Sequence, residues 1–412
     1  MTQDPHEPGA GREEESIEQF LERLVNGEPI SRRRVLRRFA AAGLTASAAT
    51  SFLAACGGVS GTKKSGKTVD VANVNHPKES FSKVVFSNWP LYIDQKVIPG
   101  WEKQYSAKMR YIEDYNDNEE FYAKVRQELE DGRGIGRDLV APTDWMAARW
   151  IDFGYATPID KKNVPNGKNL QDSLKHPPYD KNRDFTLPWQ SGITGIGYNP
   201  KKTGRKLTSV NDLYDPAFKG RVSMFTEWRD TAGLVLLGEG KNPTTATKDD
   251  YSAAIAKIDE ENKKGQIRKF TGNDYTKDLA AGNLWACVAW SGDLVQLKAD
   301  NPNLEFLVPE EGAMTWSDNM LIPQKPSTAY GAETFMNYVY DPQVAAVIAA
   351  YVNYFCPVKG VKEVLAAKSP ELANNPLIFP DEATLKQLHA YPSLGAAPER
   401  ELTAEMQKVT GA

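Results

Sequence analysis

Short apolar runs alternate with amphipathic segments along the chain beyond residue 80, and this alternation limits the fold more than any other feature. Residues 81–87, 108–115 and 138–142 are rich in apolar and β-branched side chains, so we predict strands there. The intervening segments 93–106 and 117–131 have the pattern of helices. Strands alternating with helices are typical of a mostly parallel sheet with helices on its faces. The chain is therefore expected to fold as α/β.

The helix predicted after residue 117 has clear start and stop signals. Asp117 is the expected N-cap, and Glu120 follows three residues later, as in a capping box. Gly132 is expected to end the helix. The predicted buried stripe consists of Phe121, Val125 and Leu129.

The second half of the chain continues the same pattern. Asp293 is a candidate start of one more helix, and 354–357 is expected to form a turn. Residues 187–199 are apolar and glycine-rich, which favours either a hinge strand or a strand with close backbone neighbours. We also predict a strand at 285–290 and helices at 231–237, 277–284, 331–340 and 342–353.

Trp316 and Asp318 are separated by one residue in the stretch 309–323. In an extended segment such a pair points to the same side, because side chains alternate with a period of two. An indole face beside a carboxylate is a good receptor for an organic cation. The alternative is an aromatic that packs in the core and an aspartate that caps a turn.

Glu227 and Asp230 are three residues apart before the helix predicted at 231–237. They would share one face at the start of that helix. Acidic residues there are also favoured simply by the positive end of the helix. A carboxylate pair is in addition the acid and base of many glycoside-cleaving enzymes, which keeps an enzyme among the alternatives.

The composition and motifs exclude several other classes of protein. With 412 residues the chain can form two domains, and a net charge of −4 provides no basic surface for nucleic acid. The four histidines are far apart, and no phosphate-binding loop or nucleophile elbow is present. The glycines of 132–136 precede a strand, so they form a loop and not a dinucleotide-binding turn. We expect no metal, no cofactor and no spanning helix.

The first 56 residues have the order of an export signal. Arg32, Arg33 and Arg34 precede an uncharged stretch from 39 to 55, which ends in Leu-Ala-Ala before Cys56. This segment resembles a bacterial lipoprotein signal with paired arginines, in which Cys56 would carry the lipid. Residues 1–55 are then the signal and 56–80 a flexible tether. The alternative is an internal helix with an incidental cysteine. Whether Cys287 and Cys356 pair cannot be read from the sequence.

Several short motifs resemble one family. From about Phe81 onward, the chain resembles the polyamine-binding proteins of bacterial ABC importers, of the spermidine/putrescine type. The motifs that carry this resemblance are Asn88-Trp89-x-x-Tyr92, Asn118-Glu119-x-x-Tyr122-Ala123-Lys124, Asp138-Leu139-Val140-x-Pro142, Gly192-x-x-Gly195-Ile196-Gly197, Trp316-x-Asp318 and Tyr354-x-x-Pro357.

The resemblance implies a periplasmic-binding-protein fold of type II, with two α/β lobes that close on a ligand by a hinge. Residues 81–192 and 317–362 would form lobe 1, and 193–316 and 363–412 lobe 2, with crossovers near Gly192 and Trp316. The ligand would lie in the cleft between the lobes. The implied ligand contacts are Trp89, Tyr92, Thr143, Trp145, Glu227, Asp230, Trp290, Trp316, Asp318 and Tyr354.

By this resemblance, the protein is a monomeric receptor that captures spermidine or putrescine outside the cytoplasmic membrane. It would pass the polyamine to the permease subunits of an ABC importer while Cys56 anchors it to the membrane. A receptor of the same fold for an amino acid, a quaternary amine or a sugar remains the alternative, followed by an anchored glycoside-cleaving enzyme.

Overall fold

The predicted alternation of strands and helices is present in the structure, a computed structural model that describes residues 71–411 apart from the side chain of Ala396. The predicted signal and Cys56 lie outside the described residues. The strands are β1 (Lys83–Asn88), β2 (Lys108–Glu113), β3 (Leu139–Val140), β4 (Ala156–Thr157), β5 (Thr186–Tyr198), β6 (Val222–Phe225), β7 (Ile267–Thr271), β8 (Ala286–Trp290), β9 (Glu305–Leu307), β10 (Ala313–Pro323) and β11 (Leu388–Ala390).

The helices flank these strands, and residues 71–411 contain no helix both long and apolar enough to span a bilayer. The α-helices are α3 (Ile98–Tyr105), α4 (Asn118–Glu130), α5 (Asp144–Asp152), α6 (Pro200–Thr203), α7 (Trp228–Gly238), α8 (Lys248–Lys263), α9 (Tyr275–Ala280), α10 (Ser291–Asp300), α11 (Ala329–Val339), α12 (Pro342–Val352), α13 (Val361–Ala366), α14 (Pro370–Ala373), α15 (Glu382–Lys386) and α16 (Ala396–Thr410). Short 3-10 helices are η1 (Gln95–Val97), η2 (Lys161–Asn163), η3 (Pro165–Asn169), η4 (Asp172–Leu174), η5 (Val210–Tyr214) and η6 (Pro216–Phe218).

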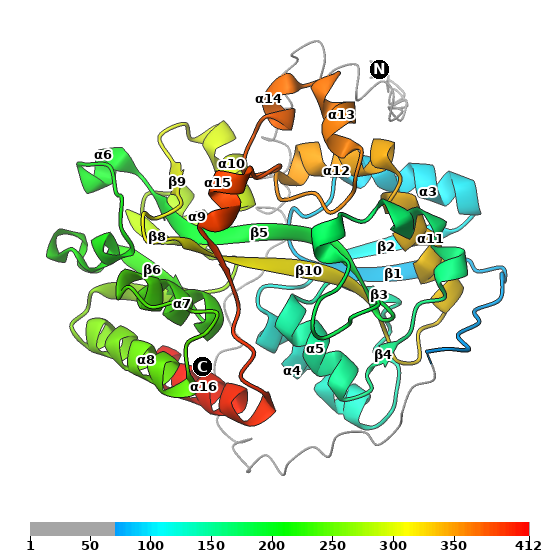
Figure 1. Ribbon diagram of the computed structural model, residues 1–412, viewed down its shortest axis with the longest axis horizontal. Helices are drawn as coiled ribbons and strands as arrows, with labels where there is room; N and C mark the ends of the chain where they lie inside the picture. The colour runs from blue at the N-terminus through cyan, green and yellow to red at the C-terminus, as the bar shows by residue number, and fades with distance from the viewer. Residues whose placement is uncertain (1–70, 412) are drawn as a thin grey trace, which may run out of the picture.

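The strands form one sheet with a parallel group at each end. The order is β2-β1-β3-β10-β5-β8-β6-β7. β1 is parallel to β2 and β3, and β6 is parallel to β7 and β8, whereas β10 and β5 run antiparallel to each other and to their outer neighbours. Figure 1 shows β5 and β10 side by side, joining the two ends of the molecule. The mixed α/β class with helices around a large sheet is therefore confirmed.

Two separate hydrophobic cores lie at the two ends of this sheet. The first core surrounds β1 and β3 and includes Trp101, Trp150 and Phe335. The second surrounds β6 and β8 and includes Trp228 and Tyr251. We call the parts of the chain around these cores the first half and the second half. The chain passes between them along β5 and β10, and Gly192 of β5 lies opposite Trp316 of β10.

A third passage between the halves lies later than the sequence suggests. We placed residues from 363 onward in the second lobe, but Leu365, Ala373 and Ile378 pack in the first core. The reason is that α13 packs next to α12, whose apolar face belongs to that core, and α14 packs next to α13. The chain then crosses, and α16 packs against α7 and α8 in the second half. In Figure 1 this last segment runs from α15 to α16.

The end of the predicted tether is fixed to the first half. The backbone N–H of His76 donates to Asp160 at 3.1 Å, and its ring Nδ1 lies 2.6 Å from an oxygen of the buried Glu333. Asn163 also donates to the carbonyl oxygen of His76 at 2.8 Å. From His76 onward, the segment predicted as a tether is therefore held against the first half, because buried polar groups of the fold take it as a partner.

Other predicted elements differ in their bounds only. α4 begins after the predicted cap Asp117 and its stripe is buried, although Val125 is half-buried. The helix predicted at 277–284 ends at Ala280, because Gly282 has a φ of +76° and turns the chain toward β8. Asp293 lies in the first turn of α10, which begins at Ser291.

Close neighbours explain the glycines of β5. A Cβ on Gly195 would overlap the carbonyl oxygen of Leu307, and one on Gly197 would lie 2.9 Å from the Cβ of Ala289. The two remaining described cysteines, Cys287 and Cys356, are buried free thiols.

Candidate functional site

A pocket lies between the two halves and encloses about 580 Å³, counting the open space at its mouth. Its walls come from β6, β7, β8, β10, α4, α5, α7 and α10 and from loops that include the one after β1. The ten residues predicted to contact a ligand all line it: Trp89, Tyr92, Thr143, Trp145, Glu227, Asp230, Trp290, Trp316, Asp318 and Tyr354. Their role in ligand binding stays a prediction.

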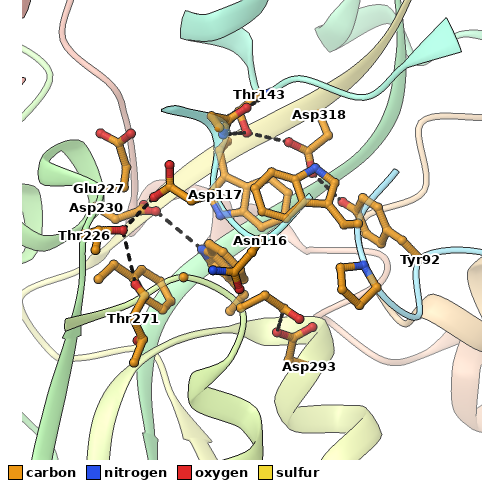
Figure 2. A pocket seen from close by; sticks show the side chains of 18 of the residues that line it. Tyr92, Asn116, Asp117, Thr143, Thr226, Glu227, Asp230, Thr271, Asp293 and Asp318 are labelled. Carbon is orange, nitrogen blue, oxygen red and sulfur yellow. Dashed lines mark hydrogen bonds between the residues drawn. The ribbon is translucent and has the colours of Figure 1, made fainter. Parts of the chain in front are cut away.

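Asp318 lies on the first-half side of the pocket and is 3% exposed. Its carboxylate accepts hydrogen bonds from the hydroxyls of Tyr92, at 2.9 Å, and Thr143, at 2.6 Å (Figure 2). Tyr92 follows β1, and the positive φ of 57° at Leu91 turns the chain so that this ring faces β10. Burial raises the pKa of Asp318 to about 8, although both hydrogen bonds lower it. The predicted pairing of Asp318 with Trp316 on one side of β10 agrees with this placement.

Asp230 lies on the opposite side of the pocket, in the first turn of α7. One carboxylate oxygen accepts a hydrogen bond from the Tyr391 hydroxyl at 2.8 Å, and the other accepts one from the indole N–H of Trp290 at 3.4 Å. Burial raises the pKa of Asp230 to about 6. The carboxylate is thus held by neutral donors, with capacity left for a cation.

A third carboxylate, that of Asp293, lies below these two in Figure 2. It accepts hydrogen bonds from the hydroxyls of Tyr354, at 2.8 Å, and Tyr275, at 3.0 Å, and from the side-chain amide of Asn273, at 2.8 Å. Its pKa is raised by burial to about 6, against the lowering effect of these donors.

Glu227 differs from the other acids because it already has a cationic partner. It is the N-cap of α7, where it accepts from the backbone N–H of Arg229 at 2.9 Å. The same oxygen lies 3.0 Å from the guanidinium of Arg229. Burial raises the pKa of Glu227 to about 7, opposed by Arg229. Glu227 is therefore favoured at this position by the start of α7, which is the alternative that the sequence left open. Asp230 is the acid of this pair that faces the aromatic rings.

The aromatic walls form a continuous chain across the pocket. The ring centroids of Trp89 and Trp290 are 5.7 Å apart, those of Trp290 and Trp316 are 6.1 Å apart, and those of Trp316 and Tyr354 are 5.5 Å apart. Tyr354 also contacts the ring of Tyr92 at 5.3 Å, edge to face. These rings come from both halves, so they meet only when the halves are close together.

Direct contacts join the two halves beside the pocket. The hydroxyl of Thr226 donates to the carboxylate of Asp117 at 2.6 Å, and the N–H of Asn273 donates to the carbonyl oxygen of Asn116 at 3.1 Å. A Cβ on Gly272 would overlap that carbonyl group. The structure is thus one in which the cleft is closed over the pocket.

Apart from tyrosines, the ionisable side chains that line the pocket are all carboxylic acids. Asp117, Glu227, Asp230, Asp293 and Asp318 line it, and no lysine, arginine or histidine is among the described lining residues. The described residues also contain no cluster of His, Cys, Asp and Glu side chains that could hold a metal ion. Aromatic faces and carboxylates together can hold an organic cation with apolar segments between its charges.

Sequence analysis missed several lining residues that the fold brings in. Asp293 was noted only as a helix start and Asp117 only as a cap, although both are acids near the start of a helix that follows a strand. No pattern in the sequence marked Tyr391 as a lining residue. It lies on a loop far along the chain and reaches the pocket only through the third passage between the halves.

Comparisons with known proteins agree with this architecture. The family model described as "Bacterial extracellular solute-binding protein" matches residues 139–388. The chain is 26% identical over 313 residues to the spermidine/putrescine-binding periplasmic protein of Escherichia coli, covering 76% of this chain and 87% of that protein. It is 28% identical over 344 residues to the putrescine-binding periplasmic protein SpuD of Pseudomonas aeruginosa, covering 78% and 90%.

Among solved structures, a putative spermidine/putrescine ABC transporter protein from Listeria monocytogenes matches with a TM-score of 0.71 at 25% identity. That match covers 80% of this chain and 99% of the other. The family model alone spans more than half of the chain. The chain therefore belongs to the family of bacterial extracellular solute-binding proteins.

Proposed function

We propose that the protein is an extracytoplasmic receptor that captures a polyamine, putrescine or spermidine, and delivers it to an ABC importer. The observation that carries this proposal is the composition of the pocket, in which five carboxylates and a chain of aromatic rings meet without a basic side chain among the described lining residues. A ligand with two or more ammonium groups on a methylene chain is complementary to such a pocket in both charge and apolar surface.

The energetics of the pocket favour this ligand class. Methylenes placed against the rings are removed from water at about 25 cal/mol per Å². Each hydrogen bond between an ammonium group and a carboxylate contributes about 1.5–3 kcal/mol net. Contacts to Asp230, Asp293 and Asp318 could therefore reach about −8 kcal/mol, the micromolar range, after the costs of association.

Other ligand classes fit the pocket less well. The carboxylate of an amino acid needs a cationic partner, which the lining does not offer. A neutral sugar would leave buried carboxylates such as Asp318 without a compensating charge. A glycoside-cleaving reaction at Glu227 and Asp230 is disfavoured because Glu227 is already paired with Arg229.

The relatives support the transport role and the place of action. Those from Escherichia coli and Pseudomonas aeruginosa are described as periplasmic polyamine-binding proteins. We therefore place this protein outside the cytoplasmic membrane, as a monomer that docks on permease subunits, anchored through lipid at Cys56. The two halves then act as lobes that close on the ligand about β5 and β10.

Calorimetric titration of the purified protein tests the proposal. Putrescine or spermidine should bind at a 1:1 ratio with micromolar or tighter affinity, whereas γ-aminobutyrate and glucose at the same concentrations should give no heat of binding. Binding of γ-aminobutyrate or glucose and not of either polyamine would contradict the proposal.

A further inference from the structure

Arg229 is a buried cation placed between two indole rings at the edge of the pocket. Its side chain is 1% exposed. The central guanidinium carbon lies 3.9 Å from the ring centroid of Trp145 and 4.2 Å from that of Trp228. Trp228 is its neighbour in α7, whereas Trp145 belongs to α5 in the first half. The contact with Trp145 therefore crosses from one half to the other.

Two carboxylates hold the guanidinium in this position. One nitrogen lies 3.0 Å from Glu227, and another lies 2.8 Å from Glu399 of α16. The cap hydrogen bond from the backbone of Arg229 to the same oxygen of Glu227 fixes that carboxylate further. In Figure 2, Glu227 lies at the periphery of the pocket and its carboxylate points away from the centre.

We propose that Arg229 is a built-in cation that occupies the two groups, Trp145 and Glu227, which sequence analysis assigns to the ligand. Arg229 thereby stabilises the closed cleft. The ammonium groups of the ligand then bind to the remaining carboxylates, Asp230, Asp293 and Asp318. This inference rests on the proposed function, because it concerns the same pocket and the same class of ligand.

The surroundings of Trp145 are the reason that a ligand cation is not expected on this ring. A second guanidinium, that of Arg149, lies 5.2 Å from the same ring centroid and pairs with Glu119 in the first half. Two positive groups already lie against the negative faces of the indole. A third cation would be repelled by both, so an ammonium group is held more favourably near Asp230 or Asp318.

The Arg229–Trp145 contact also belongs to the set of contacts that join the two halves. It supplements the hydrogen bonds from Thr226 to Asp117 and from Asn273 to Asn116. A cation–π contact is stronger when both partners are removed from water, and both Arg229 and Trp145 are buried in this closed form. Arg229 is thus a positioning residue that stabilises closure for any ligand in the pocket.

Two matched replacements of a carboxylate by an amide test whether Asp230 contacts the ligand while Glu227 pairs with Arg229. Asp230→Asn should weaken putrescine and spermidine binding at least tenfold in calorimetry, because a carboxylate that contacts ammonium is lost. Glu227→Gln should weaken it by no more than about threefold, because Gln still accepts from Arg229. If Glu227→Gln weakens spermidine binding as much as Asp230→Asn does, the inference is overturned.

The dissociation rates of putrescine and spermidine test whether the contact between Arg229 and Trp145 stabilises the closed cleft. Trp145→Leu should accelerate the release of putrescine and of spermidine by the same factor, about tenfold, since closure and not ligand contact is lost. Arg149→Gln removes a guanidinium from the same ring but leaves the contact between Arg229 and Trp145 in place, and should leave both rates within about twofold of the wild type. If Trp145→Leu changes the release rate of only one amine, or of neither, the proposal that Arg229 stabilises the closed cleft is overturned.

A second variant keeps this test decisive if Trp145→Leu does not fold. Arg229→Lys retains the charge but loses the planar stacking, so it should accelerate the release of both amines equally. Equal affinities and rates for Arg229→Lys and the wild type would contradict the inference. Wild-type protein that binds neither amine would instead overturn the proposed function, so the two failures are distinguishable.

Discussion

The hydroxyl of Tyr391 donates a hydrogen bond to the carboxylate of Asp230 at 2.8 Å, although the two residues are 161 positions apart in the chain. Tyr391 lies in the segment that returns from the first core to α16, and Asp230 lies in the first turn of α7. The hydrogen bond orients one oxygen of Asp230 and leaves its charge available to a ligand. The last crossing of the chain is therefore part of the site.

Tyr391→Phe should weaken putrescine binding about three- to tenfold. The change removes the hydroxyl that orients Asp230 and leaves the ring in place, and a hydrogen bond to a charged group is worth about 1.5–3 kcal/mol at most. Calorimetry measures the effect. Tyr214→Phe is the matched control, because its buried hydroxyl has no hydrogen-bond partner and it packs against the second core. Equal affinities for the two variants would show that Tyr391 plays no part in binding.

Asp318→Asn should have opposite effects on the empty and the ligand-bound protein. At a pH above the raised value of about 8 for the pKa of Asp318, removing this buried charge should raise the midpoint of thermal unfolding without ligand, because the carboxylate is held only by two neutral hydroxyls. The same change should weaken spermidine binding roughly 10- to 100-fold. Thermal unfolding with and without spermidine measures both effects.

Asp138→Asn is the control for that prediction. The Asp138 carboxylate accepts hydrogen bonds from the backbone N–H groups of Val85, Ser327 and Thr328, which the amide of Asn could not all satisfy. This variant should therefore lose about 1–3 kcal/mol of stability while keeping its affinity for spermidine. A destabilised empty Asp318→Asn protein would contradict the assignment of Asp318 to the ligand.

Binding should release protons and weaken as the pH falls. Burial raises the pKa of Asp318 to about 8 and those of Asp230 and Asp293 to about 6, whereas carboxylates that contact ammonium are ionised. Affinity should therefore decrease stepwise from pH 8.5 to pH 5. Calorimetry in buffers of different ionisation enthalpy counts the protons released near pH 7. No proton release at that pH would contradict burial of these acids in the empty closed form.

The same shifts give the sign of the stability change with pH. A carboxyl group whose pKa is higher in the folded than in the unfolded protein stabilises the fold below its unfolded pKa, near 4. That contribution is lost as the pH rises through the folded pKa values of about 6 and about 8. The empty closed protein should thus lose stability between pH 4 and pH 8, and spermidine should restore it.

Gly272→Ala should weaken binding of every ligand by about tenfold through incomplete closure. Its backbone φ is not in the left-handed region, but an added Cβ would overlap the carbonyl group of Asn116 from the other half. Scattering should show a larger radius of gyration for the spermidine-bound variant than for the bound wild type. Gly167→Ala is the control, because its Cβ would make only an ordinary contact, 3.7 Å from Val164. An unchanged affinity and radius would argue against a closed form of this geometry.

Local patterns predicted much of the fold because they depend on neighbours in the chain. Asp117 caps α4 as expected, since its side chain accepts from the N–H groups of Glu119 and Glu120. Trp316 and Asp318 share one side of β10 because alternation with a period of two is a property of any strand. Such signals need no knowledge of the rest of the molecule.

What the sequence by itself determined was therefore the α/β class and most of the strands and helices, whereas the ten predicted residues that line one pocket came from the resemblance to a family. The tertiary structure alone decided that Tyr391 and Asp293 join them, that residues 363–378 pack in the first core, and that His76 is fixed by Glu333. It also decided that Glu227 belongs to a buried ion pair with Arg229. These are contacts between segments far apart in the chain, and their energy depends on burial and on charges that no local pattern encodes.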